Sequence, residues 1–169
     1  MDARRLTRLA LLIAVGAVLH WLEAAVPAPV PVPGAKLGLA NIVTLYAIVA
    51  WGLSSGLYVA AGRALLGSLV GGTFGTIAFA MSLSGAVTAA LVMGLLLRLP
   101  LGPAGLSMMG ALTHNMTQLA VFALVTRYAG VFVYTPYLIL LALPAGLVTG
   151  LVALFFLKRS GYIAAASAR

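Results

Sequence analysis

The sequence predicts an all-α integral membrane protein, built as a bundle of six transmembrane helices. Of its 169 residues, 63% are hydrophobic and only 7% are charged, and its mean hydropathy is +1.16. Soluble globular domains average about 25% charged residues, so this composition excludes a soluble fold. A chain of 17.3 kDa has room for about six crossings of roughly 20 residues each. We therefore expect one membrane domain over residues 1–169 and no separate soluble domain.

Six apolar runs follow one another along the chain, and each is expected to form one span. They cover residues 6–26, 38–53, 55–71, 75–97, 104–126 and 132–157. The second and third runs are short and are joined by a tight turn at residues 51–56, so these two spans are expected to be tilted or only partly embedded.

The first run follows Arg4 and Arg5 and ends where a proline-rich stretch begins. Basic residues, an apolar stretch and the small residues at 24–28 also fit a secretory signal peptide. Cleavage would leave five spans and place the basic C-terminus outside, against the usual distribution of charge. We therefore favour a retained first span.

A proline-rich segment at residues 26–34 separates the first and second runs. It holds four of the eight prolines at alternating positions, which favours extended polyproline geometry. The segment is either a spacer or a lid over an outward-facing site, with Lys36 at its hinge.

Basic residues orient the predicted bundle. With an even number of spans, one side carries Arg4, Arg5, Arg8, Arg98, Lys158 and Arg159. Cytoplasmic loops are enriched in lysine and arginine, so we expect both termini in the cytoplasm. The net charge of +8 is dispersed among helix ends and forms no basic stripe, so nucleic acid is not an expected partner.

Polar side chains in or beside the predicted spans are the candidate binding residues, because hydrocarbon tolerates them only where they face a protein cavity or a partner. The substrate-binding candidates are Lys36, Asn41, Arg63, Ser84, His114, Asn115 and Gln118. Because His114, Asn115 and Gln118 are separated by one to four residues, they are expected to project from one sector of a helix.

Arg63 and His114 each allow a structural alternative. The guanidinium of Arg63 stays protonated, so it either awaits an anionic or strongly polar substrate or bonds to Glu23, Asn115 or exposed carbonyls. His114 either bridges helices or couples site occupancy to pH between about 5 and 8.

The chain lacks the residues that several kinds of chemistry require. The chain has no cysteine, so it offers no thiolate metal site and no cysteine nucleophile. Asp2 and Glu23 are its only acidic residues, too few to hold magnesium against a diphosphate. No phosphate-binding P-loop pattern occurs. We expect no catalytic activity, cofactor or bound metal, and any nucleotide-driven work must come from another polypeptide.

Small residues form a smooth stripe on the first predicted helix. Ala10 and Ala14 are four residues apart, and Gly16 and Ala17 follow them. The stripe either packs inside the bundle or forms a docking face for another membrane protein.

Three further stretches resemble one known family. Residues 33–41 read PGAKLGLAN, residues 82–85 read SLSG and residues 110–118 read GALTHNMTQ. Together they resemble the Gx transporter family, often described as heptaprenyl diphosphate synthase component I, and the resemblance covers nearly the whole chain.

That family is similar to the substrate-binding S components of energy-coupling-factor (ECF) importers. The resemblance implies a six-helix protein in the plasma membrane of a prokaryote, which captures a small vitamin-like or cofactor-precursor solute. It also implies that Ala10 and Ala14 contact a transmembrane T component and that two cytoplasmic ATPases complete the importer.

Two other functions stay open at this point. A non-catalytic accessory subunit in polyprenyl diphosphate or quinone metabolism would use the basic ends to recruit a soluble synthase. A solitary facilitator, or an assembly factor for membrane redox enzymes, would use the polar residues to line a path or to hold a flavin.

Overall fold

The computed structural model describes residues 3–25 and 38–162, and within them each predicted span contains one α-helix. The helices are α1 (Ala3–Ala25), α2 (Asn41–Trp51), α3 (Leu53–Val70), α4 (Ile77–Leu95), α5 (Gly102–Thr126) and α6 (Thr135–Arg159). Two short 3-10 helices, η1 (Leu96–Arg98) and η2 (Ala129–Tyr134), lie in the connections before α5 and α6. The described residues form no strand, so the all-α prediction is confirmed.

Five helices among the described residues are long and apolar enough to cross a membrane, and α2 is the exception. With 11 residues, α2 is about 16 Å long, roughly half of a hydrocarbon core about 30 Å thick. Gly52 ends α2 and begins α3 at a φ of 89°, a backbone conformation that glycine adopts without strain. α2 is therefore a half-length helix that turns sharply into a full-length one.

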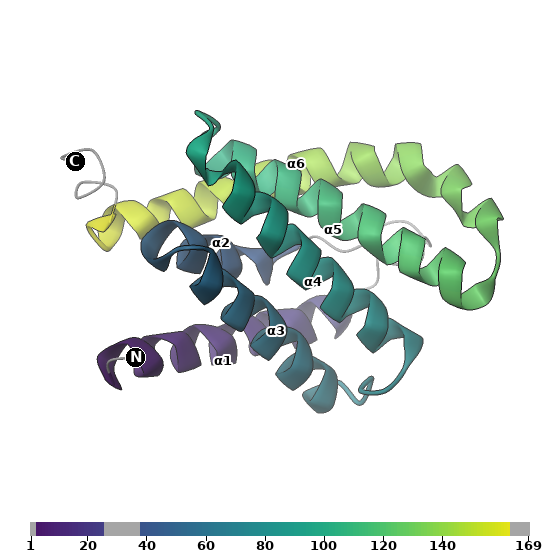
Figure 1. Cartoon of the computed structure of the whole chain (residues 1–169), viewed down its shortest axis with the longest axis horizontal. Helices are drawn as coiled ribbons and strands as arrows, with labels where there is room; N and C mark the ends of the chain where they lie inside the picture. The colour runs from purple at the N-terminus through teal and green to yellow at the C-terminus, as the bar shows by residue number, and fades with distance from the viewer. Residues whose placement is uncertain (1–2, 26–37, 163–169) are drawn as a thin grey trace.

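One end of the bundle gathers most of the basic residues, and we call it the basic end. The start of α1, the turn between α2 and α3, η1 and the end of α6 all lie there (Figure 1). The basic end carries Arg4, Arg5, Arg8, Arg98, Lys158 and Arg159. Arg5 Nη2 donates a hydrogen bond of 2.7 Å to Ser55 Oγ, which ties the start of α1 to α3. Arg127 follows α5 at the opposite end.

Close packing of α5 on α6 depends on the glycine pair Gly146 and Gly150. A Cβ atom on Gly146 would lie 2.6 Å from Met108 Cα, and one on Gly150 would lie 2.7 Å from Ala104 Cα. The hydroxyls of Ser107 and Thr149 are hydrogen-bonded across the same interface at 2.9 Å. The two backbones therefore approach as small residues allow in membrane helices.

The small-residue stripe of α1 divides between two faces. Gly16 and Ala17 are buried in the bundle, whereas Ala10 and Ala14 are exposed. The later residues of the stripe therefore pack inside the bundle, whereas its earlier pair lies on the exposed surface.

Candidate functional site

Arg63, in the middle of α3, is only 2% exposed, and its guanidinium is bound by α2. Nη2 donates a hydrogen bond of 2.6 Å to Asn41 Oδ1, and Nε donates one of 3.0 Å to Thr44 Oγ1. Asn41 and Thr44 are three residues apart on the first turn of α2, so they present their oxygens on one face. The sequence identified Asn41 and Arg63 but not Thr44.

Glu23 supplies negative charge to this group from the end of α1. It is 9% exposed and interacts electrostatically with Arg63. Its Oε1 also accepts a hydrogen bond from the backbone N–H of Gly38, just before α2. Of the structural partners expected for Arg63, Glu23 acts through its charge, while the described hydrogen bonds go to Asn41 and Thr44 instead.

A glycine on α1 makes room for the Arg63 side chain. A Cβ atom on Gly16 would lie 3.0 Å from both Cβ and Cδ of Arg63 and 2.9 Å from Val43 Cγ2. The absence of a side chain at this position therefore lets α1 pack directly over the buried arginine.

A second polar group lies where α4 packs on α5. His114, Asn115 and Gln118 are 6%, 3% and 1% exposed, as expected for residues that share one inward sector of α5. A Cβ atom on Gly85 of α4 would lie 3.1 Å from His114 Cε1 and 3.1 Å from Gln118 Cγ. Gly85 thus brings α4 close to both side chains, and Ser82, one turn earlier on α4, is also buried.

Among the buried polar atoms with no hydrogen-bond partner within residues 3–25 and 38–162 are Asn41 Nδ2, Gln118 Oε1 and Ser68 Oγ. Leaving a buried donor or acceptor unsatisfied costs about 1–3 kcal/mol, and such groups in a native protein call for an explanation by a function, a water or a ligand. Two of the three belong to residues that the sequence predicted to bind substrate.

Two predicted site residues are not brought into these groups. Ser84 is half-buried, and its Oγ donates to its own helix, at 2.6 Å to the carbonyl of Ala80 and 3.1 Å to that of Met81. Lys36 lies outside the described residues, as does the proline-rich segment beside it. The predicted binding set therefore divides into an Arg63 group on α2 and α3 and a His114 group on α5.

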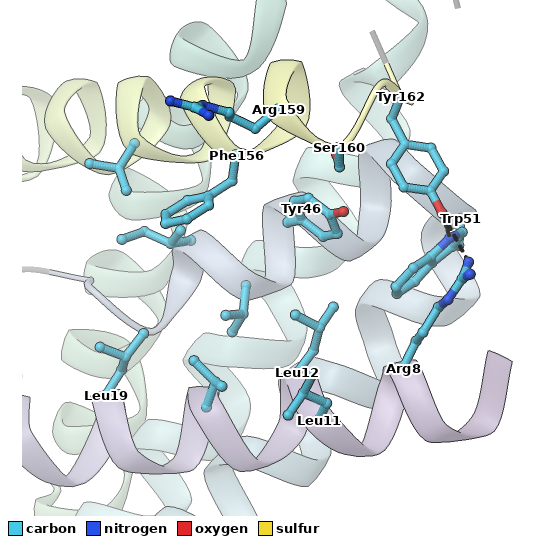
Figure 2. Close-up of a pocket in the computed structure, with 14 residues that line it drawn as sticks. Arg8, Leu11, Leu12, Leu19, Tyr46, Trp51, Phe156, Arg159, Ser160 and Tyr162 are labelled. Atoms are coloured by element: carbon cyan, nitrogen blue, oxygen red, sulfur yellow. Dashed lines mark hydrogen bonds between the residues drawn. The ribbon is translucent and has the colours of Figure 1, made fainter. Parts of the chain in front are cut away.

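A cavity of about 890 Å³ lies between α1, α2 and α6, and its lining includes Ile42 and Val43, the two α2 residues between Asn41 and Thr44. Figure 2 shows Leu11, Leu12 and Leu19 of α1 across the space from Tyr46 of α2 and Phe156 of α6. None of the predicted substrate-binding residues lines this cavity. Sequence reasoning missed it, because the cavity forms only where the last helix, α6, packs beside the first two helices of the chain.

The comparisons with known proteins place the chain in a family. The family model of heptaprenyl diphosphate synthase component I matches residues 12–156, a region that includes both polar groups. No curated protein and no solved structure matches the chain significantly. The matched region covers most of the sequence, so the chain belongs to the heptaprenyl diphosphate synthase component I family.

Proposed function

We propose that this protein is the substrate-binding membrane subunit, or S component, of an ECF-type importer for a small vitamin-like or cofactor-precursor solute. In this proposal all six helices are embedded in the plasma membrane of a prokaryote, and both termini face the cytoplasm. A T component and two ATPases supply the work, and the chain itself performs no covalent chemistry. The exposed pair Ala10 and Ala14 is the contact with the T component.

The Arg63 group is the observation that carries this proposal. α2 begins at Asn41, about 15 Å along its axis from Trp51 at the basic end. The N-terminus of a helix carries partial positive charge, and here Arg63 lies beside it. Asn41 Nδ2 adds a buried donor with no partner among the described residues. Positive charge and a spare donor deep in an apolar bundle suit a carboxylate, phosphate or carbonyl group of a solute.

In this proposal the His114 group binds the other side of the solute. Gln118 Oε1 is a buried acceptor without a described partner, and Asn115 and His114 are buried on the same sector of α5. We assign the solute site to Asn41, Arg63, Ser84, His114, Asn115 and Gln118, with Lys36 at its mouth. A site of this kind rejects analogues that lack the matching polar groups, because its own buried groups would then stay unpaired.

Gln118→Leu tests the proposal, because a binding role for Gln118 predicts a loss of affinity for the solute, whereas a structural role predicts a loss of stability. The variant removes an unsatisfied buried acceptor, so the free energy of unfolding should stay the same or rise. If Gln118 binds the solute, affinity should fall by at least about tenfold, the effect of losing one buried hydrogen bond.

Native mass spectrometry of gently purified protein would identify the retained solute, and equilibrium binding and thermal unfolding would be compared for both proteins. Thr113→Ala is the matched control on the same helix, since the Thr113 hydroxyl donates only to the carbonyl of Met109 in the described contacts and Thr113 is not part of the assigned site. Unchanged affinity together with a lower melting temperature in Gln118→Leu would show that Gln118 is structural and would count against the proposed site.

A second candidate function is a non-catalytic accessory subunit in polyprenyl diphosphate metabolism. The family description names heptaprenyl diphosphate synthase, and the basic residues gathered at one end of the bundle offer a surface for a soluble synthase. Copurification with a prenyltransferase, in the absence of a T component and a bound solute, would favour this function over the first.

A further inference from the structure

The cavity between α1 and α6 is a groove with apolar walls and an open side, and we call it the α1–α6 groove. Its floor is α2, through Ile42, Val43 and Tyr46. Its walls include Leu11, which is 64% exposed, and Phe156, which is 53% exposed. The groove is therefore accessible from the surface of the bundle.

The length of the groove matches one leaflet of a bilayer. Along α1 its lining runs from Arg8 to Leu19, twelve residues whose Cα atoms span about 16 Å along the helix axis. Half of a hydrocarbon core about 30 Å thick is about 15 Å. An acyl chain that entered at the basic end would thus be covered from the headgroup level to the middle of the membrane.

The basic end of the groove carries polar groups suited to an anionic headgroup. Tyr162 Oη accepts hydrogen bonds from Trp51 Nε1 at 2.8 Å and from Arg8 Nη1 at 3.4 Å, as Figure 2 shows. A hydroxyl that accepts twice still has its own proton to donate, and the guanidinium of Arg8 has further N–H groups. Arg159, from the last turn of α6, also lines the cavity, but its guanidinium lies over the Phe155 ring, 5.6 Å from the ring centroid, and points away from Arg8 and Tyr162 (Figure 2).

Three aromatic rings pack against one another at the basic end of the groove. The rings of Tyr46, Trp51 and Tyr162 pack edge to face in all three pairs, with centroids 5.9 to 6.1 Å apart. Tryptophan and tyrosine are enriched where a membrane meets water, so the three rings mark the headgroup level.

We propose that the α1–α6 groove binds an anionic phospholipid from the leaflet at the basic end. One acyl chain lies along Leu12, Val15 and Leu19, and the phosphate lies against Arg8 and the Tyr162 hydroxyl. Charge complementarity and the leaflet-length apolar wall together select this occupant. In a bilayer, lipid is always present at high concentration beside an open groove. A ligand at high concentration occupies even a site of modest affinity. The proposal is independent of the solute site.

The test uses tryptophan fluorescence, because the chain has two tryptophans and one of them, Trp51, lines the groove. In a Trp21→Phe background, Trp51 is the single reporter. Phosphatidylglycerol with a nitroxide on its acyl chain near the glycerol should quench it at several-fold lower mole fraction than phosphatidylcholine with the same label. Arg8→Gln should reduce this preference roughly fivefold, the effect of one basic residue near an anionic surface.

Two further variants separate the groove from general surface charge. Arg98→Gln removes a basic residue at the same end that does not line the cavity, so the lipid preference should persist. Val15→Phe narrows the apolar wall at a 42% exposed position and should weaken quenching by both lipids while leaving the melting temperature unchanged.

Several outcomes would overturn the proposal. One is equal quenching of Trp51 by the two lipids. Another is an equal loss of the preference for phosphatidylglycerol in Arg98→Gln and Arg8→Gln. A third is undiminished quenching in Val15→Phe. Displacement of the labelled lipid by an equimolar amount of farnesyl diphosphate would instead assign the groove to a prenyl diphosphate. Protection of Trp51 from every lipid by a copurified membrane subunit would assign it to a protein helix.

Discussion

Different neighbours of Arg63 bind its N–H groups and balance its charge. A buried guanidinium costs several kcal/mol unless its donors and its charge are both matched. Here two uncharged acceptors, Asn41 and Thr44, bind its N–H groups, while Glu23 balances its charge from α1. Because the acceptors stand on α2 and the cation on α3, the same bonds hold these two helices together at mid-bundle.

Thr44 is therefore predicted to matter for stability. Thr44→Val keeps the shape of the side chain but leaves Arg63 Nε–H without its acceptor, which should lower the free energy of unfolding by about 1–3 kcal/mol. Thermal unfolding in detergent measures this loss. Thr113→Val is the control, because the Thr113 hydroxyl donates only to the carbonyl of Met109 on its own helix. An equal effect of the two substitutions would contradict the role given to Thr44.

The sequence indicated some of these residues and not others, for physical reasons. Arg63, Asn115 and Gln118 stand out because charge and amide groups are costly in hydrocarbon and rarely occur there without a reason. Thr44 gives no such signal, since a threonine can satisfy its hydroxyl on its own helix, as Thr149 does with the carbonyl of Ala145. Its contact with Arg63 exists only once α2 and α3 are folded against each other.

At the scale of elements, the helices were predictable and their mutual packing was not. The apolar runs end at glycine, proline and basic residues, so the predicted spans match the observed helices to within three residues at each end. Glycine pairs are harder to interpret. Gly146 and Gly150 pack on α5, whereas Gly71 follows the end of α3 and Gly75 adopts a φ of 79° in the next turn. Spacing alone does not distinguish these two cases.

The α5–α6 interface gives a prediction at this scale. In Gly150→Ala the new methyl group would lie 2.7 Å from Ala104 Cα, a backbone atom that cannot move without separating the helices. The free energy of unfolding should fall by about 1–3 kcal/mol, as for other overpacked cores. Thermal unfolding would be compared with Gly105→Ala, whose nearest neighbour is the Leu101 side chain. If Gly150→Ala were as stable as Gly105→Ala, the close approach of α5 and α6 would not be needed.

On the scale of the whole molecule, charge separates the two ends of the bundle. Six arginines and lysines of the described residues lie at the basic end, while Arg127 lies at the other. Cytoplasmic segments are enriched in such residues, so the basic end should face the cytoplasm. This orientation also places the proposed lipid site in the inner leaflet, where anionic lipids provide the negative surface potential.

Orientation can be tested directly, because the natural chain has no cysteine. Tyr128 is 64% exposed beside Arg127, and Ser160 is exposed at the end of α6. A membrane-impermeant maleimide should label Tyr128→Cys in intact cells and Ser160→Cys only after permeabilisation. The reverse pattern would invert the bundle in the membrane, and labelling of both in intact cells would place the two ends on the same side.

The half-length of α2 has a consequence for the electrical resistance of the membrane. Its N-terminus brings the positive end of a helix dipole, together with the Arg63 guanidinium, to about the middle of the bundle. Glu23 balances the charge of Arg63, so the positive charge that remains at this depth is that of the helix end, and such a charge opposes the passage of cations, as it does in pores that exclude them. The same helix end that would attract an anionic solute is therefore expected to disfavour cations at that depth while the site is empty.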